Sequence, residues 1–469
     1  MWLRLLGCFL IVFWAGCKGQ SDVEELDTSE VVTDTAIPDD TGTKPQDWWL
    51  HETIESLVYV SWTQEDEANV AVEYRFDGED WRISPEKLRQ AGDHTQILVG
   101  IPYDTDFEYR LVYYTDKGPD KSDLTAGRTG EIPVSGLTPE VLASNPSRSE
   151  ATGGYLLGSV NVTNSGWVHG DYWMYIIDDQ ARVVWAYLVP DRHFCIHAGL
   201  SLDKQSLVWD DLSYWTEFDR GADSVANWMK LDGTIETSVP IPGANHAFTE
   251  LSDGSVAWWA MDLDSNTYDG ELKIMGPDGK VESVWSCKDF MAEQGMSGSC
   301  LANTVYWHEA TDTFVLSFAM ADFVVEVERY TLQSTLRSFG DTPSAWEFSD
   351  PDTVFYVQHA ASYTDTGTLL LSTHTHANTN EAVVREYEVD EKTQELVEVW
   401  TYGEGAGVNA PLGGYVERLP SGNTLHNYGL TPRAKEIAND GEVVWDLLWP
   451  VPGQIGRTVL IDDLYALVE

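Results

Sequence analysis

Residues 272–285 read LKIMGPDGKVESVW, and this stretch decides the fold of the chain. Two apolar-alternating runs flank an Asp-Gly pair, which is typical of a β-hairpin whose turn matches the right-handed twist of its strands. The same pattern returns as YIIDDQARVVW at 175–185 and as KEIANDGEVVW at 435–445. Related hairpins lie near residues 231–233, 330–332 and 389–391. Six copies of one supersecondary unit indicate a repeat architecture.

Most hairpins follow a first half that contains a short apolar strand. Copies of this first half begin at His197, His246, Asn303, His359 and Gly414. The two halves together make a four-stranded unit, and radial repetition of such units protects their sheet edges. The sequence therefore predicts an all-β protein, with a six-bladed β-propeller over residues 134–469.

Histidine opens the first half in three of these copies, at His197, His246 and His359. The innermost strand of each propeller blade lines the central channel, so we predict that the three imidazoles meet at one end of that channel. A single histidine at such a place is more often structural. Three at one repeat position favour a shared axial site, and a role in closing turns is the alternative.

A smaller unit precedes the propeller. Short alternating strands at 58–62, 69–75, 95–99 and 107–114 are separated by turn residues, which predicts a small β-sandwich over residues 47–133. The run IPYDTDFEYRL that begins at Ile101 resembles the fibronectin type III pattern. We expect this unit to be a spacer or a cap, because it carries no catalytic constellation.

The first 17 residues predict export. Arg4 precedes an apolar run that is too short to span a bilayer. The run ends in WAGC, which resembles a bacterial lipobox with Cys17 as the lipidated residue, and an ordinary cleaved signal is the alternative. Residues 18–46 are acidic and free of aromatics, which predicts a disordered tether. Lys18 after the cysteine favours a lipid-anchored protein of the outer membrane, by resemblance to sorted lipoproteins.

The charge of the chain excludes some partners. Its 28 basic and 77 acidic residues give a net charge of −49. Phosphate contacts need clustered lysine and arginine, so we expect no nucleic-acid partner and no contact with anionic lipid surfaces. Membrane contact is expected through the lipid anchor alone.

Cysteine usage fits an oxidising compartment. Cys287 and Cys300 are close in the sequence and either pair or stay free, whereas Cys195 is expected to be a buried apolar residue. No Cys-x-x-Cys pair is present, so no structural zinc site is predicted. Asp262, Asp264 and Asn266 have the spacing of a calcium loop, but Thr267 replaces its turn glycine, and a solvated turn is the simpler interpretation.

The order of the motifs resembles the bacterial arylsulfotransferase family. The motifs are the hairpins that end in Val-Val-Trp, the histidine-led strands, QHA at 358–360, LPSGNTL at 419–425 and GRT at 456–458. The resemblance implies transfer of a sulfuryl group from an aryl sulfate to a phenol through a histidine nucleophile. It implies small aryl sulfates and phenols as partners, and neither a nucleotide donor nor another cofactor.

The resemblance also assigns roles. His359 matches the nucleophile, His246 matches a supporting donor, and His197 has the same place in its own blade. The chain departs from the family at Leu301 and Ala319, where the pattern has a histidine and an arginine. Each lost donor would remove roughly 2–4 kcal/mol of transition-state stabilisation, so a degenerate propeller that binds a ligand or an envelope partner is the alternative. The nearby residues that would compensate are Arg192, His193 and His308.

Overall fold

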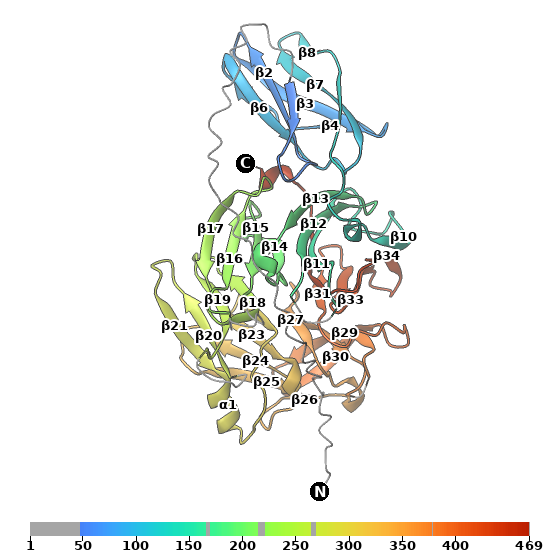
Figure 1. Ribbon diagram of the computed structural model, residues 1–469. Coiled ribbons are helices and arrows are strands. Elements are labelled where there is room, and N and C mark those ends of the chain that lie inside the picture. The colour runs from blue at the N-terminus through green and yellow to red at the C-terminus, as the bar shows by residue number, and fades with distance from the viewer. Residues whose placement is uncertain (1–46, 166–168, 214–220, 264–268, 378, 469) are drawn as a thin grey trace, which may run out of the picture. The chain divides into compact units, whose positions relative to one another are not determined.

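The computed structural model describes residues 47–165, 169–213, 221–263, 269–377 and 379–468 (Figure 1). The predicted signal peptide, the lipidation site Cys17 and the acidic tether lie outside the described residues. Within them, antiparallel sheets dominate and helices are short. None of the described helices is long and apolar enough to cross a membrane. The fold is an all-β propeller preceded by a small β-sandwich, as the sequence predicts.

The sandwich packs two sheets over an apolar core. One sheet has the strand order β1-β2-β6, and the other is built on the pair β3 and β7. Alternating residues of β2, β3 and β7 are fully buried between the sheets, as Val60, Val72 and Tyr109 illustrate. The strands are β1 Asp47–Leu50, β2 Val58–Gln64, β3 Ala68–Phe76, β4 Arg82–Ile83, β5 Lys87–Arg89, β6 Gly92–Leu98, β7 Asp106–Thr115, β8 Gly118–Lys121 and β9 Thr125–Arg128.

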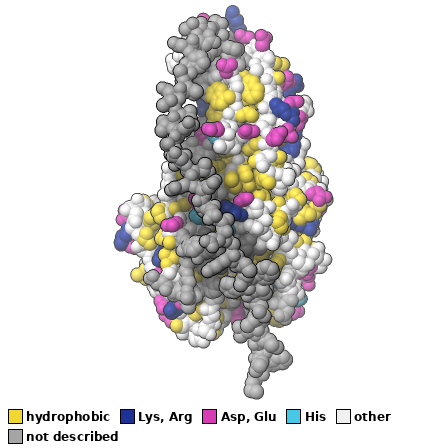
Figure 2. Space-filling view, viewed as in Figure 1, with side chains coloured by type: hydrophobic (Ala, Val, Ile, Leu, Met, Phe, Trp, Pro, Cys, Tyr) yellow, Lys and Arg dark blue, Asp and Glu magenta, His cyan; other side chains and the backbone are white. Residues whose placement is uncertain are grey.

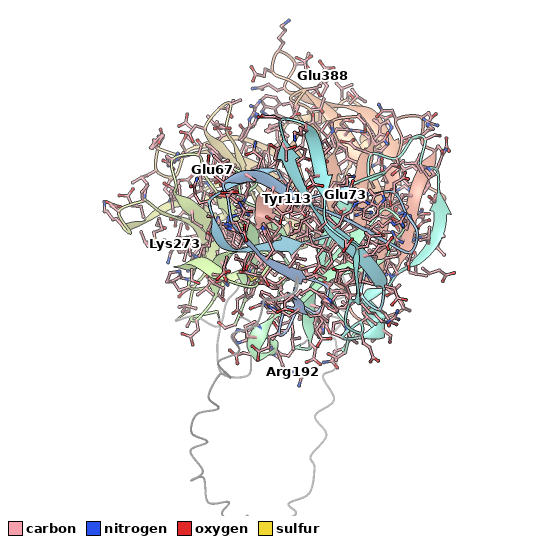
Figure 3. The ribbon with its side chains drawn as sticks, turned by 90° about the horizontal axis from the view of Figure 1, so that it is seen from above. Glu67, Glu73, Tyr113, Arg192, Lys273 and Glu388 are labelled. Carbon is pink, nitrogen blue, oxygen red and sulfur yellow. A yellow bond between two sulfur atoms is a disulfide. The ribbon has the colours of Figure 1, made fainter. Side chains whose placement is uncertain are left out.

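The described residues that follow form six antiparallel blades. From the inner strand outward, blade 1 is β35-β11-β12-β13, blade 2 is β14-β15-β16-β17 and blade 3 is β18-β19-β20-β21. Blade 4 is β22-β23-β24-β25, blade 5 is β27-β28-β29-β30 with β26 outside, and blade 6 is β31-β32-β33-β34 with β10 outside. In Figure 3, Lys273 and Glu388, which belong to the third strands of blades 3 and 5, lie toward the rim.

The bounds of the strands and short helices follow the chain. β10 Glu140–Ser144 precedes blade 1 in the chain and joins blade 6. Blades 1 to 3 contain β11 Tyr155–Asn161, β12 Tyr172–Asp178, β13 Val183–Leu188, β14 Ala198–Leu200, β15 Leu207–Asp211, β16 Val225–Met229, β17 Ile235–Pro240, β18 Ala244–Glu250, β19 Val256–Met261, β20 Gly270–Met275 and β21 Val281–Ser286. Blades 4 to 6 contain β22 Thr304–His308, β23 Thr313–Phe318, β24 Phe323–Glu328, β25 Thr335–Gly340, β26 Glu347–Phe348, β27 His359–Tyr363, β28 Leu369–His374, β29 Ala382–Asp390, β30 Glu395–Tyr402, β31 Tyr415–Arg418, β32 Thr424–Tyr428, β33 Thr431–Ile437 and β34 Val443–Leu448, and β35 Ile455–Ile461 returns to blade 1. The helices are η1 Ser135–Leu137, η2 Pro190–Arg192, α1 Cys287–Glu293, η3 Ala319–Ala321, η4 Pro351–Thr353 and η5 Tyr465–Leu467.

Both ends of the propeller segment help to close the ring. β35 is the inner strand of blade 1 and pairs antiparallel with β11. β10, from the start of the segment, pairs antiparallel with the outer strand β34 of blade 6. Figure 1 shows β10 beside the red strand β34 of blade 6. The sequence displays only five first halves because the sixth is divided between the two ends.

The tryptophans that end several hairpins have a structural role between blades. Trp185 donates its indole N–H to the carbonyl of Leu231 at 2.6 Å, which joins blade 1 to blade 2. Trp285 of blade 3 donates to Thr335 Oγ1 of blade 4 at 2.9 Å. These large side chains are fully buried, so each provides apolar packing and a satisfied polar group at a blade junction.

The pairing of the cysteines is resolved for the described residues. Cys287 and Cys300 form a disulfide with their Cα atoms 5.7 Å apart, and it fastens the start of α1 to the segment that leads into blade 4. Cys195 is a free, buried cysteine. Acidic side chains are scattered over the face seen in Figure 2 rather than gathered in one patch.

Candidate active site

A cavity of about 1080 Å³ lies where the inner strands of the blades meet. All six blades contribute to its wall, and this size suits a small organic ligand. One polar lining residue from each blade defines the chemistry. In blade order these are Arg457, His197, His246, Tyr306, His359 and Glu417. The three histidines predicted from the repeat thus line one cavity.

The mouth of the cavity lies at the turns that follow the inner strands. β27 begins at His359 and leads to the exposed turn residues Asp365 and Thr366, which also line the cavity. His359 itself is only 7% exposed. The imidazole therefore lies deeper than the turns, in a region from which most bulk water is excluded.

His359 has a defined tautomer. Its Nδ1 lies 2.9 Å from the carbonyl oxygen of Val357, which can only accept, so Nδ1 carries the proton. Nε2 holds the lone pair and accepts a long hydrogen bond from the Gly413 N–H at 3.3 Å. Burial lowers the pKa of His359 to about 4, although the Val357 carbonyl opposes this shift. The imidazole is neutral at physiological pH.

The backbone around His359 is strained. Val357 has φ of 50° and Ala360 has φ of 55°, in the left-handed region that costs an L residue roughly 1–2 kcal/mol. Between His359 and Ser362 the pairing of β27 with β28 shifts register, which marks a bulge that directs the imidazole to the cavity. Such strain persists only where the surroundings enforce it.

Hydrogen bonds from blade 4 hold this strained backbone in place. The backbone N–H of Val357 donates to Asp322 Oδ1, and that of Ala360 donates to Thr304 Oγ1. Gln358, between them, is held by both its side chain and its carbonyl. These bonds are Gln358 Nε2 to the Phe323 carbonyl at 2.8 Å, Asn303 Nδ2 to the Gln358 carbonyl at 2.8 Å and Ser317 Oγ to the same carbonyl at 3.1 Å. The neighbouring blade thus preorganises residues 357–360.

His246 is electrostatically coupled to His359. It lies in β18, where the pairing with β19 also shifts register, between Ala244 and Phe248. Burial is the first cause that lowers the pKa of His246 to about 3, and the positive charge that His359 carries when it is protonated is the second. Both imidazoles are therefore neutral at physiological pH, and a neutral imidazole offers one N–H donor and one acceptor.

Arg457 places a guanidinium in the cavity. Its Nη1 lies 3.1 Å from His197 Nε2, and since guanidinium only donates, His197 accepts there. Its Cζ lies 4.7 Å from the ring centroid of Tyr415, over the ring face. Burial, and then the Arg457 charge, hold the pKa of His197 well below its usual value.

Two of the residues expected to compensate for lost donors lie elsewhere. The Arg192 side chain is 62% exposed and pairs with Asp171, and Figure 3 shows it at the rim. His193 bonds Asp211 at 2.7 Å and is not a lining residue. His308 does line the cavity, near its mouth. The arginines among the described lining residues are instead Arg418 of blade 6 and Arg457, which comes from the closing strand β35.

The two departures from the family pattern lie outside the cavity wall. Leu301 packs against an apolar core cluster between blades 3 and 4, and Ala319 is buried at the start of η3. Neither place holds a polar group. Asn303, two residues after Leu301, lines the cavity, and its side-chain amide donates a hydrogen bond to the carbonyl of Gln358.

Metal-binding geometry is absent from the part of the chain that the structure describes. No group of three or more histidine, cysteine or acidic side chains is arranged to hold an ion there. His374 lies 2.8 Å through Nε2 from the Ala410 carbonyl, and His376 is exposed. The calcium-like stretch runs from Asp262 into residues 264–268, which are outside the described residues.

Comparisons with known proteins do not identify the chemistry of this site. No family model matches the chain, and no curated protein matches it. A Bacteroides caccae protein of unknown function is similar with TM-score 0.45 and 16% identity, over 66% of this chain and 99% of that one. The periplasmic gluconolactonase PpgL of Pseudomonas aeruginosa is similar with TM-score 0.40 and 12% identity, over 84% and 99%. Virginiamycin B lyase of Staphylococcus aureus is similar with TM-score 0.37 and 11% identity, over 62% and 88%.

At such values these similarities carry no argument about chemistry.

Proposed function

We propose that this protein transfers a sulfuryl group from an aryl sulfate to a phenolic acceptor in its axial cavity, with His359 as the nucleophile. One observation carries the proposal: a buried, neutral imidazole with its lone pair on Nε2 shares a cavity with an arginine. An unprotonated imidazole is an available nucleophile at neutral pH. A guanidinium matches the charge of the sulfate ester.

The reaction divides into two transfers. Nε2 of His359 attacks sulfur, a nitrogen–sulfur bond forms, and the bond from sulfur to the aryl oxygen breaks with its electron pair on that oxygen. The acceptor phenol oxygen then attacks sulfur and gives up its proton, which balances the proton gained by the released aryl oxide, and the electron pair of the nitrogen–sulfur bond returns to Nε2. The Val357 carbonyl, 2.9 Å from Nδ1, stabilises the positive charge that the ring acquires between the two steps.

Charge on the sulfuryl oxygens needs fixed donors. Arg457 and His246 line the same cavity as His359. The Gly413 N–H, which touches Nε2 in the resting site, becomes free for a sulfuryl oxygen when sulfur bonds to that nitrogen. The rings of Tyr306, Trp307 and Tyr415 also line the cavity and suit an aryl group.

A second candidate function is ligand binding without turnover. The observation that favours it is the apolar or buried setting of Leu301 and Ala319, where the family pattern has donors. A cavity of the same shape would then hold an aryl anion through Arg457 and release it unchanged.

Turnover of 4-nitrophenyl sulfate with phenol as acceptor separates the two functions. We expect release of 4-nitrophenol from the wild-type protein and loss of at least about 1000-fold in His359→Gln. Mass spectrometry of acid-quenched, alkaline-digested protein should find the added sulfuryl group on the peptide that contains His359. His376→Gln, at an exposed position outside the cavity, is the matched control and should keep wild-type turnover. Binding of the ester without turnover would favour the second function.

We also propose that Cys17 carries a lipid that holds the protein in the cell envelope, at the outer membrane. The WAGC sequence at residues 14–17 supports this. Labelling with a palmitate analogue should mark the wild-type protein and not Cys17→Ala, which should be recovered without a lipid.

A further inference from the structure

We propose that Glu417 is the acid–base residue of this cavity, which gives a proton to the departing aryl oxygen and takes one from the attacking phenol. The inference rests on the proposed sulfuryl transfer and adds to it a catalytic group that the family resemblance does not assign. It begins from β31, the inner strand of blade 6, which carries no histidine.

The alternation of β31 directs Glu417 toward the cavity. Tyr415 and Glu417 are separated by two positions, so their side chains share one face of the strand. Tyr415 lies beneath the Arg457 guanidinium, and Tyr415, Glu417 and Arg457 all line the cavity. Val416, between them, is buried in an apolar cluster with Ala360 and Leu370, against which Tyr415 also packs.

The Glu417 carboxyl is incompletely satisfied. Its Oε2 is buried and has no hydrogen-bond partner among the described residues. An unpartnered buried carboxylate oxygen is costly, and a strand position that serves packing alone would carry an apolar residue. Burial raises the pKa of Glu417, and the Arg457 guanidinium offsets part of that rise. The carboxyl therefore holds its proton to a higher pH than a solvated glutamate does.

Other groups of the cavity are less suited to the proton transfer. Burial lowers the pKa of His246 to about 3 and that of His359 to about 4, so neither holds a transferable extra proton at neutral pH. Glu250 accepts the backbone N–H of Leu202 at 3.0 Å, and Asp365 lies in the exposed turn at the mouth. The guanidinium of Arg418 is tied to Glu386.

The proton balance closes without any further reactant. As the sulfur–oxygen bond breaks, the Glu417 carboxyl proton passes to the aryl oxygen, which leaves as a neutral phenol. Glu417 is then a carboxylate, and the nearby positive charge of Arg457 stabilises it. As the acceptor attacks the sulfo-histidine, its phenolic proton passes to Glu417, which restores the starting state of both residues.

A leaving-group series tests this role. General acid catalysis contributes about 100-fold to 10000-fold where the leaving group needs a proton. With 4-methylphenol as the acceptor, so that donor and product differ, we expect Glu417→Gln to lose at least about 100-fold in kcat/KM for phenyl sulfate. The loss should be no more than several-fold for 4-nitrophenyl sulfate, whose phenolate leaves without a proton. Glu417→Ala should regain turnover of phenyl sulfate when formate is added, which shows that a free carboxylic acid fills the role. Glu404→Gln, an exposed glutamate beyond β30, should behave as wild type on both esters.

Each outcome decides a separate question. Equal losses on the two esters, or no loss on either, would overturn the role of Glu417 while wild-type turnover and its dependence on His359 remain. If the wild-type protein turns over neither ester, the sulfuryl-transfer proposal itself fails, and the acid–base role fails with it. Thermal melting of the variants separates these results from misfolding, and the formate response is independent of it.

Discussion

Residues 301–304 of blade 4 and residues 357–360 of blade 5 occupy the same place in neighbouring repeats, and they differ in backbone conformation and in the side chains that they carry. The blade 5 segment carries an imidazole between two left-handed residues, Val357 and Ala360. The blade 4 segment has no residue with positive φ and buries part of Leu301 in an apolar cluster. Its polar side chains, on Asn303 and Thr304, hydrogen-bond to the blade 5 segment.

The difference shows how a repeat protein builds a single site from equivalent parts. A strained backbone is stable only when neighbouring groups hold it. Blade 4 contributes no imidazole at its histidine position, and its side chains instead fix the conformation that presents His359. Blade 5 acts on the ligand in our proposal, and blade 4 supports it.

The largest expected contrast between the two segments is in their response to acid. The pKa of His359 is about 4 in the folded protein, below the usual value for histidine of about 6.5. The unfolded chain therefore binds a proton before the folded one does, and stability falls as the pH drops from about 6.5 toward 4. This histidine should remove about 3 kcal/mol over that window. Leu301 has no group that titrates.

Guanidinium denaturation near pH 7 and near pH 4.5 measures this effect. His359→Gln should lose about 2–3 kcal/mol less between the two conditions than wild type does. His376→Gln, in its exposed turn, should follow the wild-type curve. If His359→Gln and wild type lose equal stability, the imidazole is not held in its neutral form.

A smaller effect is expected from the support that blade 4 gives. Asn303→Ala removes the amide that donates to the Gln358 carbonyl at 2.8 Å, and Ser317 remains as its second donor. Because misplacement of a nucleophile lowers the rate of the chemical step, kcat should fall about 10-fold to 100-fold. KM should change little, since Asn303 is not expected to hold the substrate.

Leu301→Ala provides the matched control two positions away. Leu301 packs against an apolar cluster, so its truncation should cost about 2 kcal/mol of stability and leave kcat within about 2-fold. Stopped assays of 4-nitrophenol release and melting curves of both variants give the two readouts. A fall in kcat of similar size in both variants would mean that blade 4 acts through general stability rather than through Asn303.

The sequence predicted the parts of this site that depend on local signals. Asp-Gly turns and alternating strands indicate hairpins within a few residues, and the repeated His197, His246 and His359 indicated a common position. Arg457 belongs to the GRT motif at 456–458, to which the sequence assigned no role, and Glu417 had no signal of its own. Arg457 lies on β35, near the C-terminal end of the propeller segment, whereas its partner strand β11 lies near the start of that segment. No local sequence pattern therefore places Arg457 beside His197.

The strained backbone could not be predicted either. Val357 is a β-branched residue with positive φ, a conformation that its own preferences disfavour. Its support comes from Asp322, on a loop of blade 4. Sequence patterns indicate what a residue prefers, whereas tertiary contacts decide where the preference is overridden.

The smallest expected effect concerns the cost of that strain. Ala360 has φ of 55°, which glycine adopts without penalty, so Ala360→Gly relieves roughly 1–2 kcal/mol of left-handed strain. The same change raises the entropy of the unfolded chain, at a cost of about 0.4–1 kcal/mol, and removes a methyl group from an apolar cluster, at a cost of about 0.8 kcal/mol. These contributions nearly cancel, so the stability should change by less than about 1 kcal/mol, measured by denaturant unfolding. The hydrogen bond from the backbone N–H of residue 360 to Thr304 Oγ1 should persist.

Ala361→Gly is the control that separates the relief of strain from the general cost of replacing alanine with glycine. Ala361 is fully buried in β27 and does not have positive φ, so glycine there brings only the entropic cost and the loss of a packed methyl group. That variant should lose about 1 kcal/mol or more. A clearly smaller loss of stability in Ala360→Gly than in Ala361→Gly would locate the strain at residue 360. Equal destabilisation of both would mean that residue 360 is unstrained, and the contrast between blades 4 and 5 would then rest on side chains alone.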